Sequence, residues 1–302
     1  MRRPDIFVCI ASYRDPETQW TIADLFRKAT YPDRVRVGVC WQYLPEDSWY
    51  IQAPVRPAQV SALHFDATES QGACWARSLA HGLRGHEEYT LQLDSHIRLH
   101  HGWDERLIDM LASCPSSRPV LSSYPAPYTP PDDLQCGVFM LAPRNWEHHG
   151  VVSLEGKPIV SPLPVRCPWI AGGFIFSRSN LWDEVPYDPS LYFIGEEATL
   201  SVRAFSRGWD AYAPNECIVH HYYGRQQQPK HWTDHRRWSD KNLFSVRRAK
   251  HLLGAVVERD VRIISGLDGP LGLGDARTLR EFEAFARIDF RRSCRSVETG
   301  AV

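Results

Sequence analysis

The sequence has no excess of charge of either sign, because 35 Lys and Arg residues stand against 36 Asp and Glu residues in a chain of 302. Binding to nucleic acid or to a membrane surface as the main activity needs a basic excess and is therefore not indicated. No apolar run approaches the ~18 residues that a membrane-spanning helix requires, which excludes a membrane-spanning protein. The N-terminal apolar run, Ile6 to Ala11, is too short for a signal peptide and is followed by polar residues, so we expect a cytoplasmic protein.

The eight cysteines form no Cys-x-x-Cys pair, so the spacing of a zinc ribbon is absent. A chain of this length without a secretion signal needs no disulfide framework. Several cysteines lie inside apolar stretches, and we expect them to pack as small hydrophobic side chains. With 43% hydrophobic and 24% charged residues, the composition is that of a soluble globular protein, and the length allows one large domain or two small ones.

The first hundred residues alternate between strand and helix patterns. Short continuous apolar runs are typical of strands that are buried on both faces. The patterns predict strands over Ile6–Ala11, Val35–Trp41, Val60–Phe65 and Tyr89–Leu93, and helices over Glu17–Ala29 and Ser70–Leu83. This order favours an α/β fold with a mainly mixed sheet flanked by helices, as in nucleotide-binding proteins.

The middle of the chain changes character. Eleven of the 22 prolines lie between Pro115 and Pro168, so we expect loops and a hairpin there rather than a helix. A strand over Ile170–Ser177 and an amphipathic helix over Asp188–Arg207 are predicted next, and Trp209–Tyr223 is again strand-like.

The chain beyond Arg225 is rich in His, Trp and Arg and ends with a predicted turn and helix over Leu271–Phe290. No internal repeat and no clean linker separates it from the preceding part. We therefore expect one main domain over residues 1–225 and a C-terminal extension, residues 226–302, packed against it as a single compact unit.

Residues that could hold a metal follow the predicted strand that ends at Leu93. Asp94 and His96 are two positions apart, so in extended backbone their side chains leave on the same face and can reach one ion. A carboxylate oxygen and an imidazole suit Mn²⁺ or another divalent cation, and ligands bind at the carboxyl ends of strands in open α/β sheets. His220 and His221 end another apolar run and are candidates for a third ligand. Polar groups of a loop and a strand end are the plainer interpretation of the same residues.

Three further segments carry residues suited to a sugar nucleotide, each with a plainer alternative. Gly172 and Gly173 lie between apolar residues, which permits backbone to pass close to a ligand or accommodates a β-bulge. Glu196 and Glu197 precede a predicted helix, where they would accept hydrogen bonds from sugar hydroxyls or interact with the helix dipole. Arg77 would pair with phosphate or form a surface salt bridge.

Taken together, these segments resemble the glycosyltransferases related to the Skp1 hydroxyproline N-acetylglucosaminyltransferase, and the chain has the character of a bacterial-type homologue. The resemblance covers nearly the whole chain, and its motifs are specific only in combination. Its centre is Gln92-Leu93-Asp94-Ser95-His96, which is close to that family's Asp-Ser-His signature. The other similar segments, in chain order, are Ile10–Asp15, Gly72–Arg77, Trp169–Gly173, Phe193–Glu197, His221–Arg225, Leu273–Thr278 and Ile288–Phe290.

The resemblance implies a GT-A fold, the Rossmann-like fold of nucleotide-diphospho-sugar transferases, for residues 1–225. It implies UDP-GlcNAc as the donor and Mn²⁺ or Mg²⁺ as the metal. The implied metal ligands are Asp94, His96 and His221, with His221 preferred to His220 because it fits the family's His-x-Tyr-x-Arg spacing. The implied donor-binding residues are Ala11, Ser12, Arg14, Arg77, Asp94, Ser95, Trp169, Gly172 and Gly173, and the implied catalytic residues are Asp94, Glu196, Glu197 and Arg225.

The implied reaction moves a sugar, GlcNAc by default, to a hydroxyl acceptor, on a peptide or protein in the first instance, with retention of configuration. A metal and an arginine would neutralise the negative charge that develops on the departing UDP. Two alternatives stay open: a nucleotide-sugar or diphosphate hydrolase in which Glu197 activates water at the same metal, and a non-catalytic sugar-binding protein. The sequence does not specify the acceptor, which could be a peptide, a small molecule or a glycan.

Overall fold

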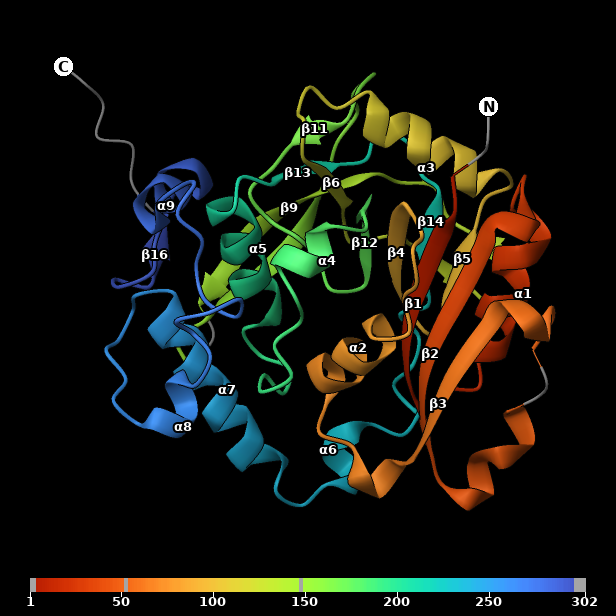
Figure 1. Ribbon diagram of the computed structural model, residues 1–302, viewed down its shortest axis with the longest axis horizontal. Helices are drawn as coiled ribbons and strands as arrows, with labels where there is room; N and C mark the ends of the chain where they lie inside the picture. The colour runs from red at the N-terminus through yellow and green to blue at the C-terminus, as the bar shows by residue number, and fades with distance from the viewer. Residues whose placement is uncertain (1–3, 52–53, 147–148, 296–302) are drawn as a thin grey trace.

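The computed structural model describes residues 4–51, 54–146 and 149–295, and its centre is a mixed sheet of eight strands (Figure 1). The strands lie in the order β11-β13-β6-β12-β4-β1-β2-β3. Their bounds are β1 Ile6–Tyr13, β2 Val35–Tyr43, β3 Val60–Asp66, β4 Tyr89–Asp94, β6 Pro119–Ser122, β11 Val165–Arg166, β12 Phe174–Arg178 and β13 Asp210–Ala213. Strands β1 to β4 run parallel to one another, so their carboxyl ends meet at one edge, while β12 runs antiparallel between β4 and β6.

Helices cover both faces of this sheet. The α-helices are α1 Thr18–Lys28, α2 Ala73–His81, α3 Trp103–Ala112, α4 Leu181–Glu184, α5 Glu196–Ser206, α6 His231–Asp234, α7 Trp238–Leu252, α8 Val261–Ile264 and α9 Leu279–Ala286. Short 3₁₀ turns are η1 Pro32–Arg34, η2 Pro45–Tyr50, η3 Pro57–Gln59 and η4 Ala67–Glu69. Within the described ranges, no helix is both long and apolar enough to cross a membrane.

Strand β1 shows how the apolar runs build the core. Successive side chains of a strand point to opposite faces. Ile6, Val8 and Ile10 pack with α1 and α3 on one face, whereas Phe7 and Cys9 pack against α2 on the other. All five are buried, because helices cover both sides of the strand. This two-sided burial explains why the strand has a continuous apolar run rather than an alternating pattern.

A smaller sheet lies against the carboxyl edge of the main one. Its order is β5-β14-β7-β8, with bounds β5 Ile97–Leu99, β7 Ala126–Thr129, β8 Asp133–Leu134 and β14 Val219–His221. Strands β5 and β14 are antiparallel, with His221 opposite Ile97 and His220 opposite Arg98. Adjacent strand residues face opposite sides, so the two neighbouring histidines are presented to different surroundings.

The C-terminal part packs against α5 and a hairpin. The hairpin pairs β9, Phe139–Trp146, with β10, Val152–Pro158, and a last small pair joins β15, Ile288–Asp289, to β16, Cys294–Arg295. One hydrophobic cluster contains Trp169 and Val202 from the predicted main domain together with Ala249 and Phe282 from the predicted extension. The two predicted parts thus share a core, and the boundary between residues 225 and 226 stays a prediction.

The structure confirms the predicted strands of the first hundred residues and the first two helices, with shifts of a few residues at their ends. The strand predicted over Ile170–Ser177 begins later, at Phe174 in β12, and the strand-like stretch Trp209–Tyr223 forms two strands, β13 and β14, in different sheets. The predicted helix over Asp188–Arg207 is too long: α5 begins at Glu196, because Gly195 has a left-handed backbone with φ of 94° that a helix cannot contain. Helices α3 and α7 were not predicted. Five of the eight cysteines are buried, as expected, whereas Cys136, Cys217 and Cys294 are not.

Candidate active site

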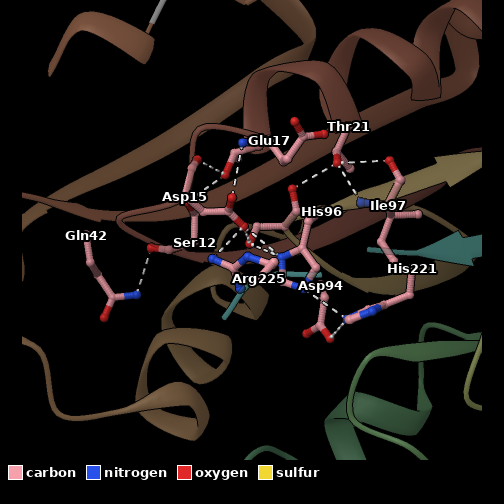
Figure 2. A network of polar contacts seen from close by, with 12 residues as sticks. Ser12, Asp15, Glu17, Thr21, Gln42, Asp94, His96, Ile97, His221 and Arg225 are labelled. Atoms are coloured by element: carbon pink, nitrogen blue, oxygen red, sulfur yellow. Dashed lines mark hydrogen bonds and ion pairs between the residues drawn. The ribbon is translucent and has the colours of Figure 1, made fainter. Parts of the chain in front are cut away.

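Asp94, His96 and His221 meet at the carboxyl edge of the main sheet. Asp94 ends β4, His96 follows two residues later, and His221 ends β14. Nε2 of His221 is 3.2 Å from Oδ2 of Asp94 and 2.9 Å from Nε2 of His96. Figure 2 shows the three side chains pointing toward one another. His220 faces the opposite side of β14, where its Nε2 lies 3.7 Å from the sulfur of Cys217.

A buried carboxylate, Asp15, orients His96. Its Oδ2 is 2.7 Å from Nδ1 of His96 and 3.3 Å from Nη2 of Arg225, and it accepts a hydrogen bond from the Ser95 hydroxyl (Figure 2). Although burial acts to raise it, the pKa of Asp15 is held well below its ordinary value by His96, Arg225 and Ser95. The ionised carboxylate therefore keeps the His96 proton on Nδ1 and leaves Nε2 free to bind a ligand.

The protonation states in this cluster suit a divalent cation. Burial lowers the pKa of His96, so its imidazole is neutral. The pKa of Asp94 lies well below its ordinary value, because His221 and Arg77 outweigh the effect of burial, so this carboxylate is ionised. Nε2 of His96 and Nε2 of His221 are 2.9 Å apart, the distance of a hydrogen bond in which one ring donates to the other, and a bound cation would take the place of the shared proton. One carboxylate oxygen and two imidazole nitrogens are a donor set that Mn²⁺ and similar ions accept.

Arg77 connects Asp94 to Glu196. Its Nη2 donates to Oδ1 of Asp94 over 2.6 Å, and its Nη1 donates to Oε1 of Glu196. Tyr187 donates its hydroxyl to the same Glu196 oxygen over 2.9 Å. The guanidinium is buried and is paired with two carboxylates through Nη1 and Nη2, so it positions them and is not the surface salt bridge considered above.

The backbone passes close to these carboxylates at Gly172 and Gly173, where a side chain would collide with them. A Cβ on Gly172 would lie 2.5 Å from Nη1 of Arg77 and 2.6 Å from Oε1 of Glu196. A Cβ on Gly173 would lie 2.6 Å from Oδ2 of Asp94. All three distances are below 3.0 Å, so a side chain at either position would require the polar groups to move, and the two glycines let the backbone before β12 pass directly under the polar cluster.

Two cavities meet at Asp94 and Arg77. The first cavity has a volume of about 280 Å³ and is lined by Ala11, Tyr13, Gln42, Gly72, Ala73, Arg77, Asp94, Ser95, His96, Tyr192, Phe193, Arg225, Pro229, Lys230, His231 and Trp232. The second cavity has a volume of about 510 Å³ and is lined by Arg77, Asp94, Tyr124, Pro125, His149, Val152, Ser153, Leu154, Gly172, Gly173, Phe193, Ile194, Gly195, Glu196, Glu197, Ala198, His221 and Tyr223. The Asp94–His96–His221 cluster thus lies where they join.

The segment that contains α6 covers the first cavity. Asp234 accepts hydrogen bonds from the Tyr13 hydroxyl, over 2.8 Å, and from Nη1 of Arg14, over 3.1 Å. His231 lies 2.7 Å from the Tyr192 hydroxyl through its Nδ1. These contacts tie α6 to the end of β1 and to the loop before α5.

Glu197 lines the second cavity and is partly exposed. Its carboxylate accepts hydrogen bonds from the Tyr124 hydroxyl, over 2.5 Å, and from the backbone N–H of Gly172, over 3.0 Å. Burial and the nearby charge of Glu196 raise the pKa of Glu197 to about 7, although Tyr124 acts in the opposite direction. Near neutral pH this group therefore exchanges readily between acid and base forms.

The structure brings most of the predicted site residues to the two cavities. Those that line them are Ala11, Arg77, Asp94, Ser95, His96, Gly172, Gly173, Glu196, Glu197, His221 and Arg225. The structure corrects the expectation that the Trp169 side chain contacts the donor. Its indole is fully buried and packs edge-on against Phe282, with ring centroids 5.2 Å apart. Ser12 is also buried, with its hydroxyl 2.7 Å from that of Thr18, and Arg14 is bound by acidic side chains rather than lining the first cavity.

Several residues of the site were not predicted. Asp15 and Tyr13 belong to the Ile10–Asp15 segment, so their position beside Ser12 and Arg14 could have indicated that they lie near the site. Tyr124 lies in the proline-rich middle of the chain, and Lys230 follows Arg225 in a segment with no recognisable motif. Nothing in the local sequence places these last two beside β4.

Comparison with known proteins identifies the family and the fold. The profile of the family described as Glycosyltransferase (GlcNAc) matches residues 5–56 and 51–292. A crystal structure of GalNAc-T7 with UDP, GalNAc and Mn²⁺ is similar at a TM-score of 0.61 and 14% identity, covering 93% of this chain and 56% of that chain. Staphylococcus aureus TarS 1-349 with UDP-GlcNAc is similar at a TM-score of 0.51 and 12% identity, covering 86% of this chain and 69% of that chain.

This chain spans little more than half of the GalNAc-T7 chain, and no curated protein sequence matches it significantly. At these identities the structural likeness establishes the fold, which is the GT-A fold that the resemblance implied. The family profile, by contrast, matches nearly the whole sequence. The chain therefore belongs to the Glycosyltransferase (GlcNAc) family.

Proposed function

We propose that this protein is a metal-dependent glycosyltransferase that moves GlcNAc from UDP-GlcNAc to a hydroxyl acceptor with retention of configuration. The observation that carries the proposal is the Asp94–His96–His221 cluster at the junction of two cavities, with a carboxylate and two imidazoles directed at one point. The bound UDP, UDP-GlcNAc and Mn²⁺ in the similar GalNAc-T7 and TarS structures support the choice of donor and metal.

The first cavity suits the nucleotide half of the donor. Tyr13 and Trp232 offer aromatic surfaces for a base, and Gln42 offers an amide. Arg225 and Lys230 add two cationic groups to the same wall, and both could contact a diphosphate. A cavity closed by α6 over these residues would also exclude water from the reactive bond.

The metal ligands in this proposal are Asp94, His96 and His221. A divalent cation held there would neutralise the charge that develops on the diphosphate as the sugar bond breaks. Asp15 holds His96 with its Nε2 free, and Arg77 holds the Asp94 carboxylate in place through Oδ1. Neither group has to move a proton during the transfer.

The second cavity suits the sugar and the acceptor. Glu196 and Glu197 face it together with the Gly172–Gly173 backbone, and both carboxylates can accept hydrogen bonds from sugar hydroxyls. Residues of β10 line its far side, so a peptide or protein acceptor could approach along this hairpin. The acceptor hydroxyl would attack the anomeric carbon from the face that UDP leaves, and a phosphate oxygen of UDP would take its proton. A closer relation to the Skp1 hydroxyproline N-acetylglucosaminyltransferase is part of the same proposal.

One observation favours hydrolysis as the second candidate function. Glu197, with a pKa raised to about 7 by burial, is able to take a proton from water near neutral pH. In that case the second cavity would hold the sugar and a water molecule, and UDP would be released without any acceptor.

The experiment is a combined binding and turnover assay on the purified full chain. UDP-GlcNAc together with Mn²⁺ should raise the melting temperature of the wild type by mass action. UDP-GlcNAc alone and Mn²⁺ alone should each raise it less. Asp94→Asn should lose this stabilisation, whereas Asp109→Asn, an exposed aspartate on α3, should keep it. UDP release that needs a hydroxyl-bearing peptide supports transfer, and equal release without acceptor supports hydrolysis. Absence of stabilisation by any UDP-sugar would refute both.

A further inference from the structure

A second group of metal-binding side chains lies on the other side of β14. The ligand atoms of His100, Cys217 and His220 all lie within 4.8 Å of one another. His220 is fully buried, and the other two are partly exposed. None of the three residues lines either of the two cavities described above.

The distances suit a zinc ion. Bonds of about 2.3 Å to sulfur and about 2.0 Å to nitrogen at a tetrahedral angle place the two ligand atoms roughly 3.5 Å apart. The Cys217 sulfur lies 3.7 Å from Nε2 of His220. The ring centroids of His100 and His220 are 4.9 Å apart, so the third ligand is also within reach. A thiolate with two imidazoles is a donor set that favours Zn²⁺, whereas the sulfur-free Asp94 cluster suits Mn²⁺.

Two features of the surroundings bear on a cation here. Backbone groups of Gln135 and Pro127 form hydrogen bonds with the buried His220 ring, and its Nε2 faces the sulfur of Cys217. Lys28 and Arg106 act electrostatically on His100, but each is already paired: Nζ of Lys28 lies 3.0 Å from Asp24, and Nη2 of Arg106 lies 2.8 Å from Glu216. Their charges are therefore largely compensated, and the Cys217 thiolate would offset part of the charge of the ion.

We propose that His100, Cys217 and His220 bind a structural zinc ion, with water in the fourth position. The Cys217 thiol would release its proton to solvent as the zinc–sulfur bond forms. This site is separate from the proposed catalytic metal and goes beyond the proposed function.

The position of the site in the fold indicates what the ion would do. His100 directly follows β5, and its backbone N–H donates to the carbonyl of Ile218 over 2.9 Å. An ion at this point would join the end of β5 to the start of β14. His96 lies just before β5 and His221 ends β14, so the same two strands carry two of the proposed catalytic ligands. The zinc would thus fix the strand pair that sets the distance between His96 and His221.

Cobalt binding to the reduced, metal-free full chain tests the proposal. Co²⁺ bound to a thiolate gives a near-ultraviolet charge-transfer band, and the Asp94 cluster cannot give that band because it contains no sulfur. In Asp94→Asn, which has lost a ligand of the other proposed site, we expect the band to saturate at one cobalt per chain and to be displaced by Zn²⁺. Cys217→Ser should abolish it, while Cys294→Ser, which alters an exposed cysteine on β16, and Asp94→Asn should retain it.

A second readout distinguishes loss of the site from loss of the fold. Without metal, Cys217→Ser should melt at the wild-type temperature. The intact Asp94 cluster would itself bind Zn²⁺, so this comparison is made in the Asp94→Asn background: Zn²⁺ should raise the melting temperature of Asp94→Asn but not that of the double variant Asp94→Asn/Cys217→Ser. The proposal is overturned by absence of the band in folded wild type, by persistence of the band in Cys217→Ser, or by its loss in Asp94→Asn. Because the band does not depend on turnover, failure of the glycosyltransferase proposal would leave this result unchanged.

Discussion

Replacing Asp15 with Asn tests whether a buried carboxylate behind His96 controls the proposed metal site. Asp15 touches neither cavity, but its Oδ2 lies 2.7 Å from Nδ1 of His96 and 3.3 Å from Nη2 of Arg225. An asparagine can present its NH₂ group to Nδ1. The ring would then carry its proton on Nε2, the nitrogen that faces Asp94 and His221, and could no longer donate a lone pair to a metal.

The expected effect follows from the role of such outer partners. Groups that orient metal-bound histidines contribute about 10- to 100-fold in metal affinity, or roughly 1.4–2.7 kcal/mol. Asp15 is fully buried and contacts His96, Arg225 and Ser95 together, so we expect an effect near the upper end of this range. The substitution keeps the volume of the side chain, so the melting temperature without metal should stay close to that of the wild type while the Mn²⁺ affinity falls.

The assay is a titration of the full chain with Mn²⁺, in which the electron paramagnetic resonance signal of the free aqueous ion reports what is unbound. Asp109→Asn is the control. The charge of Asp15 raises the pKa of His96 while burial lowers it, so the variant's His96 should protonate at lower pH. At low pH, protons therefore compete less with Mn²⁺ for His96 in Asp15→Asn than in the wild type. The difference in Mn²⁺ affinity between the wild type and Asp15→Asn should narrow as the pH falls. If Asp15→Asn binds Mn²⁺ as the wild type does while His96→Ala does not bind it, the orienting role is refuted.

Three further predictions concern the same region. Glu197→Gln should raise the melting temperature at pH 8 but not near pH 4.5. Folding raises the pKa of Glu197 from 4.5 to about 7. The stability contributed by the proton on Glu197 is therefore complete below pH 4.5 and is lost as the pH rises through about 7. A pH-independent difference would contradict this. His221→Ala removes a proposed ligand and should weaken Mn²⁺ binding by more than about 100-fold. His220→Ala removes no ligand of this site and should weaken Mn²⁺ binding much less, and calorimetric titration would reveal a reversed order. Gly173→Ala, whose Cβ would meet Asp94 at 2.6 Å, should lower turnover at least about tenfold, and unchanged kinetics would show that the carboxylate can move aside.

The parts of the fold predicted from the sequence are those whose signal is local. Val8 and Val39 lie in short apolar runs because parallel strands buried on both faces need them, and such runs predict strands directly. Helix α7 was missed because its buried positions include Ser245 and Arg248, which dilute the apolar periodicity. The start of α5 was set too early, since Leu191, Ile194 and Ala198 follow one another at the three- and four-residue spacing of a helix face.

The candidate site divides in the same way. Asp94 and His96 were predicted together because both lie within two residues of one strand end, where chain geometry alone brings them to the same face. His221 was preferred to His220 through a family resemblance, and its actual direction depends on the register in which β14 pairs with β5. A shift of one residue in that register would exchange the two histidines.

The sequence by itself determined the strand and helix order of the first hundred residues, the Asp94–His96 pair and the glycines that allow backbone beside it, because each depends on contacts between near neighbours in the chain. Only the tertiary structure decided that Asp15 orients His96, that Arg77 joins Asp94 to Glu196, which is 119 positions from Arg77, and that Trp169 packs in the core. The physical reason is that side-chain direction and burial at these positions are set by packing between distant elements. No local pattern encodes such packing, and the same residue types at the same spacings are equally compatible with a surface salt bridge or a pocket wall.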